Sequence, residues 1–350
     1  MKINIGKNSG MDVYFDTEIS LNKHVVSIGK SGGGKSVQNQ RIMTEIIRNG
    51  GTVLAFDYHQ TLADEEIFVE HKDFFKKHVT DVDVYESGIQ CPLFTPVTFA
   101  DGSHEKTIDT VGSVVEIISR QYDLKCRQQA TLRSACETVE AANLYYKQGI
   151  SAIAGLLKAD GSDVAKGVSE KIYSLTAHNI FRDGKLFLKN NAINVVRLSK
   201  LDLKTQVVVT EIVLWYLWRL AATMLFRDTG LFIYLDESQN LSSGPRSILA
   251  QILSEGRKFN LNLLLATQLL SLNSSQEAKR LLMQCGLIQF FQPSVKEIKA
   301  TADIIDHFYA EKWCSVLSVL EKGEFVAMGQ LIINGKLTDR ALKVSARSDC

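Results

Sequence analysis

The spacing of apolar residues changes twice along the chain and divides it into three parts. In residues 1–100, short apolar runs of strand length alternate with stretches where apolar residues recur at helical spacing. Residues 101–190 have helical spacing nearly throughout, and strand-like runs return in residues 191–350. Strands that alternate with helices imply a largely parallel sheet covered on both faces. The pattern therefore predicts an α/β fold in which one core, formed by residues 1–100 and 191–350, carries a helical insertion at 101–190.

The predicted strands are short, and most are continuously apolar, as is typical of buried parallel strands. We expect them at residues 25–28, 52–56, 83–85, 193–198, 231–235, 261–266 and 287–291, with a closing pair at 324–328 and 330–333. Residues 1–21 are expected to form a hairpin that turns at Asn8-Ser9-Gly10. The clearest helical patterns cover residues 37–47, 110–119, 128–146 and 245–258, and Gly50-Gly51 is expected to end the first of them.

The longest apolar stretch, residues 207–226, is the part of the chain that most resembles a membrane span. It contains Glu211 and Arg219 and lies between two predicted strands of one sheet, so a buried helix fits it better. Residues 1–20 alternate polar and apolar positions and lack the apolar core of a signal peptide. We therefore expect a cytoplasmic protein without membrane insertion.

The composition is that of an ordinary soluble globular protein, with 45% hydrophobic and 23% charged residues. A net charge of +1 gives no general attraction to nucleic acid, so any DNA contact must come from a local patch. The cysteines are scattered without a C-x-x-C pair, which argues against a disulfide framework or a zinc site and fits a reducing cytoplasm. They are Cys91, Cys126, Cys136, Cys285, Cys314 and Cys350.

Basic residues gather at the start of the predicted insertion. They are Arg120, Lys125, Arg127 and Arg133. Such a group indicates either a solvated helical face or a surface that touches nucleic acid.

Residues 29–36 match the phosphate-binding pattern G-x-x-x-x-G-K-[ST], between a predicted strand and a predicted helix. A glycine-rich turn can match this pattern by chance, but the flanking strand and helix favour a nucleotide site. Backbone N–H groups of the loop and the helix N-terminus would hold phosphates, and the expected ligand is ATP. Lys35 would reach the β- and γ-phosphates, and the Ser36 hydroxyl would ligate Mg²⁺. The expected binding residues are Gly29, Lys30, Ser31, Gly32, Gly33, Gly34, Lys35 and Ser36.

Two acidic residues follow the apolar run at 231–235. Asp236 would hold Mg²⁺, directly or through water, and Glu237 would polarise the water that attacks the γ-phosphate. An acidic pair at a strand end is also common as a solvated turn. Together with the phosphate loop, the pair indicates a nucleotide hydrolase.

Three further positions are candidates with open alternatives. Gln268 follows the strand at 261–266. It is either a polar residue at a strand end without a specific role or a group that hydrogen-bonds the γ-phosphate or the attacking water. Arg257 is either a cation at a helix C-terminus or an arginine supplied to a neighbouring subunit's phosphates. Asp57 and His59 either support the site's ligands or form a simple turn.

The order of these pieces resembles the HerA/FtsK superfamily of hexameric ATPases, and most of all HerA-like proteins and the ATPases of conjugation and type IV secretion. The resemblance covers about residues 22–61 and 191–335. Its most specific part is Glu-Gly-Arg-Lys at 255–258 followed by a strand that ends in Ala-Thr-Gln at 266–268. The other segments are residues 29–36, 57–59 and 231–237.

The resemblance implies a RecA-like P-loop NTPase core and a homo-oligomeric ring, usually a hexamer, with ATP between subunits. Lys35, Ser36, Asp236 and Glu237 would take the roles given above, with Gln268 as a polar sensor and Arg257 as an arginine finger acting in trans. Such rings drive DNA, and sometimes protein, through a central pore. The expected function is a Mg²⁺-ATP-hydrolysing motor that translocates or remodels DNA. Alternatives are an ATPase of a conjugation, secretion or packaging machine that acts on protein partners, or a nucleotide-controlled scaffold for a defence effector.

Two departures from the family pattern limit these expectations. HerA proteins carry an N-terminal β-barrel that docks a nuclease, and the residues before Val25 are too few for one, which puts a nuclease partner in doubt. Family members often have glycine after the histidine of the second strand, where this chain has Gln60, which puts a role for His59 in doubt.

Overall fold

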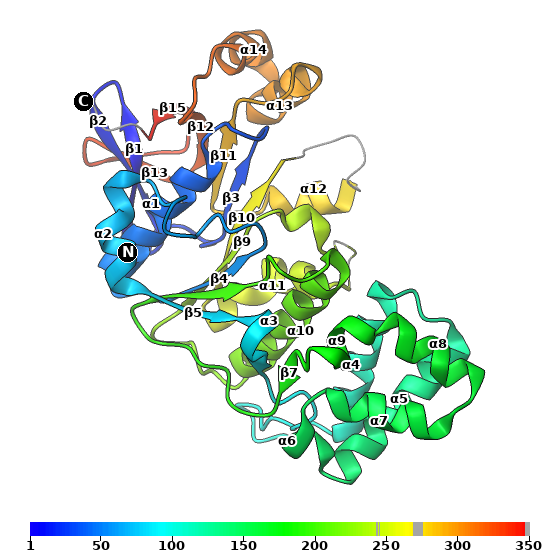
Figure 1. The fold of residues 1–350 in the computed structure, drawn as a ribbon. Coiled ribbons are helices and arrows are strands. Elements are labelled where there is room, and N and C mark those ends of the chain that lie inside the picture. Colours follow the sequence, from blue (N-terminus) through cyan, green and yellow to red (C-terminus); the bar gives the residue numbers. More distant parts are fainter. Residues whose placement is uncertain (243, 245, 269–275, 347–350) are drawn as a thin grey trace.

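The structure is a computed structural model that describes residues 1–242, 244, 246–268 and 276–346. Within them, one 13-stranded mixed sheet runs through the molecule, with helices on both sides (Figure 1). Its parallel half contains, in spatial order, β11 (Leu287–Phe291), β3 (Val25–Ile28), β10 (Leu261–Thr267), β9 (Leu231–Leu235), β4 (Val53–Asp57), β8 (Ile193–Arg197) and β5 (Val79–Asp83). Strands β3, β4, β9, β10 and β11 are buried along their whole length, as expected for parallel strands covered on both faces. The α/β, RecA-like fold predicted from the sequence is confirmed.

Alternate residues of the parallel strands enter two separate apolar cores. On one face, residues such as Val25 and Phe232 pack with α1 (Lys35–Arg48) and the N-terminal strands. On the other face, their neighbours Val26 and Ile233 pack with α10 (Leu203–Ala222), α11 (Ile248–Glu255) and the inserted helices. This alternation follows from the two-residue period of a strand, and it fixes the phosphate loop and its helix to one side of the sheet.

An antiparallel half extends the sheet beyond β11. Its order is β14 (Lys336–Thr338), β13 (Leu331–Ile333), β2 (Met11–Asp16), β1 (Lys2–Asn8), β15 (Leu342–Ser345) and β12 (Glu324–Gly329), which pairs with β11. The predicted hairpin is confirmed, since β1 and β2 pair across Ser9 and Gly10. The two predicted closing strands are confirmed, but they are not neighbours in the sheet: β12 pairs with β11 and β15, whereas β13 pairs with β2 and β14. Gln330 alone separates β12 from β13, which is too short for a hairpin loop.

The helices between residues 107 and 177 form a lobe at one end of the molecule, drawn in teal and green in Figure 1. The lobe contains α4 (Thr107–Gln121), α5 (Cys126–Ala141), α6 (Leu144–Gln148), α7 (Ser151–Asp160), α8 (Asp163–Lys171) and α9 (Tyr173–Ala177). The short parallel pair β6 (Ile89–Gln90) and β7 (Phe181–Arg182) stands at its base. Its apolar residues belong to the same core as α10 and the sheet, so the lobe is packed onto the core and not attached by a linker.

The apolar stretch at 207–226 lies within and just after α10, a helix that is mostly buried between the sheet and α4. Its two ionised residues are buried with partners: Glu211 pairs with Arg120, and Arg219 pairs with Glu105. Among the helices of the described residues, each is too short or too polar to cross a bilayer.

Two other predicted elements differ from the structure. The strand predicted at 83–85 is wrong, because β5 ends at Asp83 and a helical turn, α3 (Val84–Ser87), follows. The Asp83 carboxylate accepts hydrogen bonds from the N–H groups of Tyr85 and Glu86, which is the geometry of a helix N-cap. The helix predicted at 245–258 is shorter, since α11 ends at Glu255 and a 3₁₀ turn, η2 (Gly256–Phe259), follows; Pro245 lies outside the described residues.

The remaining helices are α2 (Val69–His78), α12 (Gln276–Leu282), α13 (Ile298–Ile305) and α14 (Ala310–Ser318), with the 3₁₀ turns η1 (Ser238–Asn240), η3 (Val295–Glu297) and η4 (His307–Tyr309). The cysteines that the structure describes are all free, and Cys350 lies outside the described residues.

Candidate nucleotide-binding site

The phosphate loop joins β3 to α1, as the sequence predicts, and glycine is required at several of its positions. Gly29, Gly32 and Gly34 have φ angles of 155°, 77° and 104°, which residues with a Cβ rarely adopt. A Cβ on Gly32 would meet no atom within 4 Å, so this part of the loop is open to a ligand. A Cβ on Gly34 would lie 2.8 Å from the backbone nitrogen of Gly323, so the other end of the loop is closely packed.

Two distant segments brace the loop through its backbone. The N–H of Lys30 donates to the carbonyl of Gln292 at 3.1 Å, just after β11. The N–H of Gly323 donates to the carbonyl of Gly33 at 3.0 Å, just before β12. Sequence reasoning missed both contacts, because they depend on β11 lying beside β3. The segment between them contains α13 and α14, so this helical pair is joined to the loop at both of its ends.

The Lys35 side chain is buried inside the loop, with 8% of its surface exposed. Its ammonium donates to the carbonyls of Gly29 at 2.7 Å and Lys30 at 3.0 Å. Burial lowers the pKa of this lysine, and the nearby charges of Asp236 and Glu237 oppose that shift. The cation is thus held by the loop carbonyls close to the acidic pair, which is where a phosphate-binding lysine is needed.

The strand order brings the other candidates to the same edge of the sheet. Strand β10 lies between β3 and β9, with Thr267 level with Ile28 and Leu265 level with Leu235. Gln268 therefore lies between the phosphate loop and the acidic pair that follows β9. Parallel strands end at one common edge, and ligands of such sheets bind there.

Asp236 is a buried carboxylate with 7% of its surface exposed. Its Oδ1 accepts the N–H of Glu237 at 3.0 Å. Burial raises the pKa of Asp236, and the charge of Glu237 raises it further. An acid in this setting is stabilised by a cation placed next to it.

The donor set fits Mg²⁺ bound together with a nucleotide. Mg²⁺ prefers oxygen ligands and is commonly held by one or two carboxylates together with substrate phosphates. Ser36, at the start of α1, and Asp236 supply a hydroxyl and a carboxylate. The described residues contain no group of three or more acidic, histidine or cysteine side chains able to hold a metal without a ligand.

Both carboxylate oxygens of Glu237 accept hydrogen bonds from side-chain amides. Gln268 Nε2 donates to Oε1 at 2.5 Å, and Gln239 Nε2 donates to Oε2. Gln239 is itself held by the Thr267 hydroxyl, which donates to its Oε1 at 2.9 Å. The backbone of Glu237 is left-handed, with φ of 51°, a conformation that is costly for a residue with a side chain. Gln268 thus contacts the candidate base directly, and Gln239, two residues after Glu237, is a part of the site that sequence reasoning missed.

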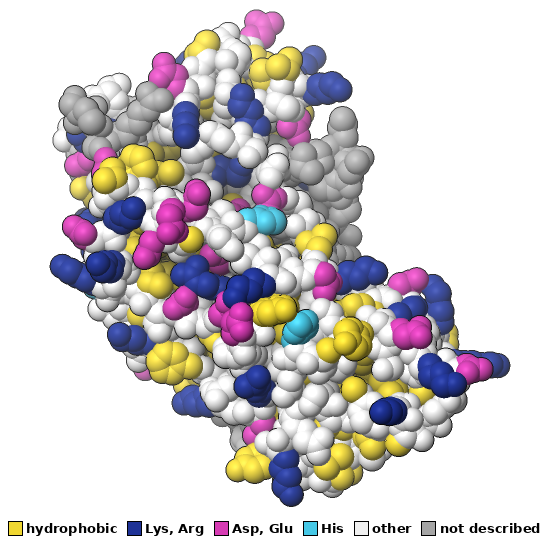
Figure 2. Space-filling view, viewed as in Figure 1, with side chains coloured by type: hydrophobic (Ala, Val, Ile, Leu, Met, Phe, Trp, Pro, Cys, Tyr) yellow, Lys and Arg dark blue, Asp and Glu magenta, His cyan; other side chains and the backbone are white. Residues whose placement is uncertain are grey.

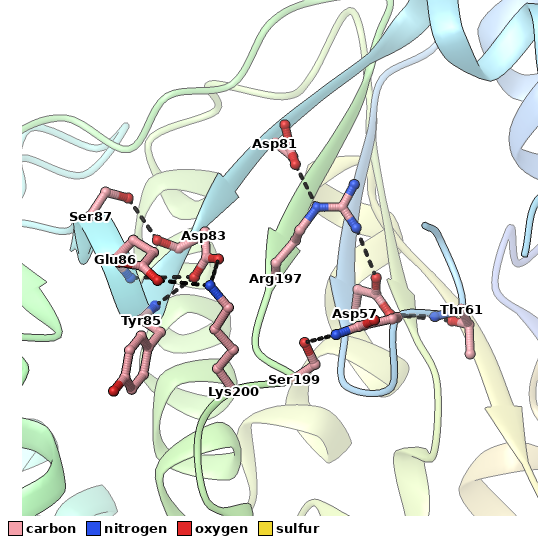
Figure 3. Close-up of polar contacts among 11 residues, drawn as sticks. Asp57, Thr61, Asp81, Asp83, Tyr85, Glu86, Ser87, Arg197, Ser199 and Lys200 are labelled. Carbon is pink, nitrogen blue, oxygen red and sulfur yellow. Dashed lines mark hydrogen bonds and ion pairs between the residues drawn. The ribbon is translucent and has the colours of Figure 1, made fainter. Parts of the chain in front are cut away.

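Asp57 is engaged in structural contacts at the end of β4 (Figure 3). Its carboxylate accepts the N–H of Thr61 at 2.9 Å and pairs with Arg197 at 3.3 Å, and Arg197 also pairs with Asp81 at 2.5 Å. Beside this group, Lys200 bridges Asp83 and Glu86. The contacts of Asp57 close the turn after β4 and, through Arg197 on β8, link β4 to β5.

His59 and Gln60 lie in the turn that follows. His59 is exposed, and its charge lowers the pKa of Asp236, opposing the larger effects of burial and Glu237. Gln60 has φ of 61°, the left-handed conformation that favours glycine, and its amide donates to the Ser199 hydroxyl at 3.3 Å. Gln60 therefore has a glycine-like backbone, at the position where the family pattern described above leads one to expect glycine.

Arg257 is the one predicted site residue that the fold places away from the others. It lies in η2, just before β10, at the amino edge of the sheet. The seven residues of β10 span about 23 Å, so this side chain cannot contact the phosphate loop of its own chain. It is exposed, and its Nη1 donates to the carbonyl of Leu21 at 3.1 Å.

The basic residues at the start of the insertion are partly neutralised by acidic neighbours. Arg120 pairs with Glu211 at 2.8 Å, and Lys125 pairs with Asp123 at 2.9 Å. On the face drawn in Figure 2, basic and acidic side chains are interspersed. For this cluster, a solvated helical face and, as its alternative, a contact with nucleic acid both stay hypotheses.

The chain is similar to known proteins over most of its length. The family model of the central domain of the helicase HerA matches residues 3–215. The chain is 23% identical to the DNA double-strand break repair helicase HerA of Sulfurisphaera tokodaii, over 94% of this chain and 67% of the relative.

Two solved structures share the fold at low sequence identity. VirB4 of Thermoanaerobacter pseudethanolicus has a TM-score of 0.72 at 15% identity, covering 99% of this chain and 96% of that one. The plasmid coupling protein TrwB, solved in complex with ADP and Mg²⁺, has a TM-score of 0.60 at 12% identity, covering 93% of this chain and 85% of that one.

Proposed function

The chain belongs to the family of the HerA helicase central domain, and on this premise we propose that it is a ring-forming ATPase that couples hydrolysis of Mg²⁺-ATP to translocation or remodelling of DNA. The observation that carries the proposal is the meeting of Lys35, Asp236 and Glu237 at one edge of the sheet, with Gln268 bonded to Glu237. The match to a HerA helicase over most of the chain supports the DNA part.

In this proposal, the loop residues hold the triphosphate of ATP. Their N–H groups and the N-terminus of α1 offer donors and a partial positive charge to the phosphates. Lys35 moves its ammonium from the carbonyls of Gly29 and Lys30 to the β- and γ-phosphate oxygens. Ser36 and Asp236 would hold Mg²⁺, which when bound would neutralise charge on the phosphates. The nucleotide and Mg²⁺ bound by TrwB support this choice of ligands.

Glu237 acts as the base in the proposed hydrolysis. It accepts a proton from the attacking water, and the amides of Gln268 and Gln239 fix the orientation of its carboxylate. Because Gln268 contacts Glu237 and also follows β10, a change at the γ-phosphate that moves this amide would reach the strand. This contact supports the role of polar sensor for Gln268.

Arg257 completes the site of a neighbouring copy. It cannot reach its own phosphate loop, and it is exposed at the opposite edge of the sheet. In a head-to-tail ring two different surfaces of the chain meet, which allows the amino edge of one copy to lie against the carboxyl edge of the next. There the guanidinium would stabilise the charge that develops on the transferred phosphoryl group.

ATP turnover tests the proposal, measured for the wild type and for Glu237→Gln, with and without duplex DNA. Glu237→Gln keeps the shape of the side chain but removes the base, so we expect turnover to fall by about 100-fold or more while ATP binding persists. We expect DNA to stimulate the wild type. Unchanged turnover in the variant would contradict the site assignment. Wild-type turnover that is indifferent to DNA would remove the DNA part and favour a motor that acts on protein partners.

A further inference from the structure

A buried carboxylate on α10 joins the inserted helices to the segment that follows the acidic pair. Glu211 has 1% of its surface exposed. Its Oε1 accepts the backbone N–H of Ser242 at 2.9 Å. Its Oε2 accepts from Arg120 at 2.8 Å and from Gln121 at 3.2 Å, both at the C-terminal end of α4. One side chain therefore contacts three elements: α10, α4 and the segment after β9.

These contacts fix the position of the Glu211 carboxylate. A buried carboxylate is stable only when its charge is paired and its oxygens accept hydrogen bonds. Arg120 supplies the positive charge, and Gln121 and Ser242 supply neutral donors. Removing any one partner leaves a charged group under-compensated in a dry environment, so the three partners are held together as a unit.

The segment from Asp236 to Ser242 is fixed at its start, middle and end. The segment directly follows β9, a strand of the sheet. In its middle, the Ser238 hydroxyl donates to the carbonyl of Ala266 on β10 at 3.2 Å. At its end, the backbone N–H of Ser242 donates to the carboxylate of Glu211. Glu237, between the first two of these points, has a left-handed backbone that the surrounding contacts must maintain.

We propose that Glu211 is a positioning residue for the candidate base Glu237, and that it makes hydrolysis depend on where α4 lies; the proposal rests on the ATPase function given above. Glu211 anchors the end of the Asp236–Ser242 segment, and Arg120 sets the orientation of Glu211. Arg120 has a side chain that is 35% exposed, and it lines an open cleft of about 330 Å³ that also involves α10 and α11. A change in the insertion can therefore reach the hydrolysis site through one salt bridge and one hydrogen bond.

The variant Ser242→Pro tests the anchor with the smallest change. Proline lacks the N–H that Glu211 accepts, and Leu241 before it is extended, with φ of −82° and ψ of 157°, as a residue before proline must be. We expect kcat for ATP to fall about tenfold or more, because small displacements of a catalytic group are costly, while KM changes less than about twofold. Ser242→Ala, which keeps the N–H, is the matched control and should retain kcat.

The variant Arg120→Ala tests the other side of the link. It should also lower kcat. In the double variant Arg120→Ala/Ser242→Pro, kcat should fall no more than about a further twofold below that of the less active single variant, because both changes act through Glu211. Lys166→Ala, which removes an exposed ion pair of the same lobe outside the basic cluster, should leave kcat unchanged. Binding of a non-hydrolysable ATP analogue, measured by calorimetry, should be the same in all variants.

Wild-type kcat in Ser242→Pro, or additive losses in the double variant, would overturn the proposal while ATP hydrolysis stands. A loss of analogue binding that parallels the loss of kcat would also overturn it, because that result indicates general damage to the site. A wild type without ATP turnover would overturn the proposed function and this inference with it.

Discussion

At the scale of single residues, the site contains charges that the fold stabilises poorly. Burial and the neighbouring Glu237 raise the pKa of Asp236, so ionising this carboxylate costs more free energy in the folded chain than in the unfolded one. Burial likewise lowers the pKa of Lys35. Such costs are typical of sites that are prepared for a ligand of opposite charge, here phosphates and a divalent cation.

Asp236→Asn should therefore stabilise the nucleotide-free protein at pH 7 while abolishing ATP turnover. The amide carries no charge and can still accept the N–H of Glu237, so we expect a gain of roughly 1 kcal/mol in the free energy of unfolding. The gain should shrink as the pH falls through the raised pKa of Asp236 toward its ordinary value, because the wild-type carboxyl is then neutral as well. Urea unfolding of both proteins at several pH values measures this, and a less stable variant at pH 7 would contradict it.

Some site residues could be predicted from the sequence because their signals are local. The phosphate loop is eight consecutive residues, and Asp236 and Glu237 directly follow an apolar strand. Gln239, Gly323 and Glu211 could not be predicted, because each matters through a partner from another element. Gly323 contacts the phosphate loop because β12 begins beside Gly34, which the sequence does not indicate.

At the scale of elements, β3 and β10 each connect the two edges of the sheet. At their carboxyl ends lie the phosphate loop and Gln268. Before the amino end of β3 lies Leu21, whose carbonyl accepts a hydrogen bond from Arg257. Before the amino end of β10 lies η2, which contains Arg257. His24 joins these two strands: its Nδ1 accepts the N–H of Leu263 at 2.9 Å. The two strands therefore carry both the site of one copy and the arginine proposed for the next.

His24 should make stability fall in mild acid. Burial lowers its pKa from 6.5 to about 4, so between these pH values the unfolded chain binds a proton that the folded chain does not. The free energy of unfolding should drop by about 3 kcal/mol as the pH falls from 6.5 to 4. His71, whose pKa burial also lowers, adds a drop of the same sign.

Urea titrations from pH 7 to pH 4 on the wild type and on His24→Asn isolate this contribution. The asparagine can accept the N–H of Leu263 but does not titrate, so its curve should be flatter in this window. Parallel curves would show that His24 is not buried as a neutral ring.

Element types were predicted better than element pairings. The buried parallel strands are apolar runs of the length that such strands have, so their positions follow from the sequence. The strand expected at 83–85 failed because Asp83 serves as a helix cap, a local contact that outweighs the apolar pattern. The two closing strands were predicted, but their neighbours were not: β12 pairs with β15 and β13 pairs with β2, from the two ends of the chain.

At the scale of the whole molecule, the distance between Arg257 and the phosphate loop is the decisive feature. One copy contains the phosphate loop, the acidic pair and Gln268 at one edge, and the exposed Arg257 at the other. If the arginine works in trans, activity belongs to the junction between two copies. Changes on either side of a junction should then complement each other.

Co-expression of Lys35→Ala with Arg257→Ala, each carrying a different tag and purified through both tags, tests this most directly. Each variant alone should lose most ATP turnover, by about 100-fold or more, because one lacks the phosphate lysine and the other the arginine. In the mixed assembly, a junction between an intact loop and an intact Arg257 should restore turnover to about a quarter of the wild-type value for random mixing in a ring. A mixed assembly no more active than either variant alone would contradict a site shared between copies.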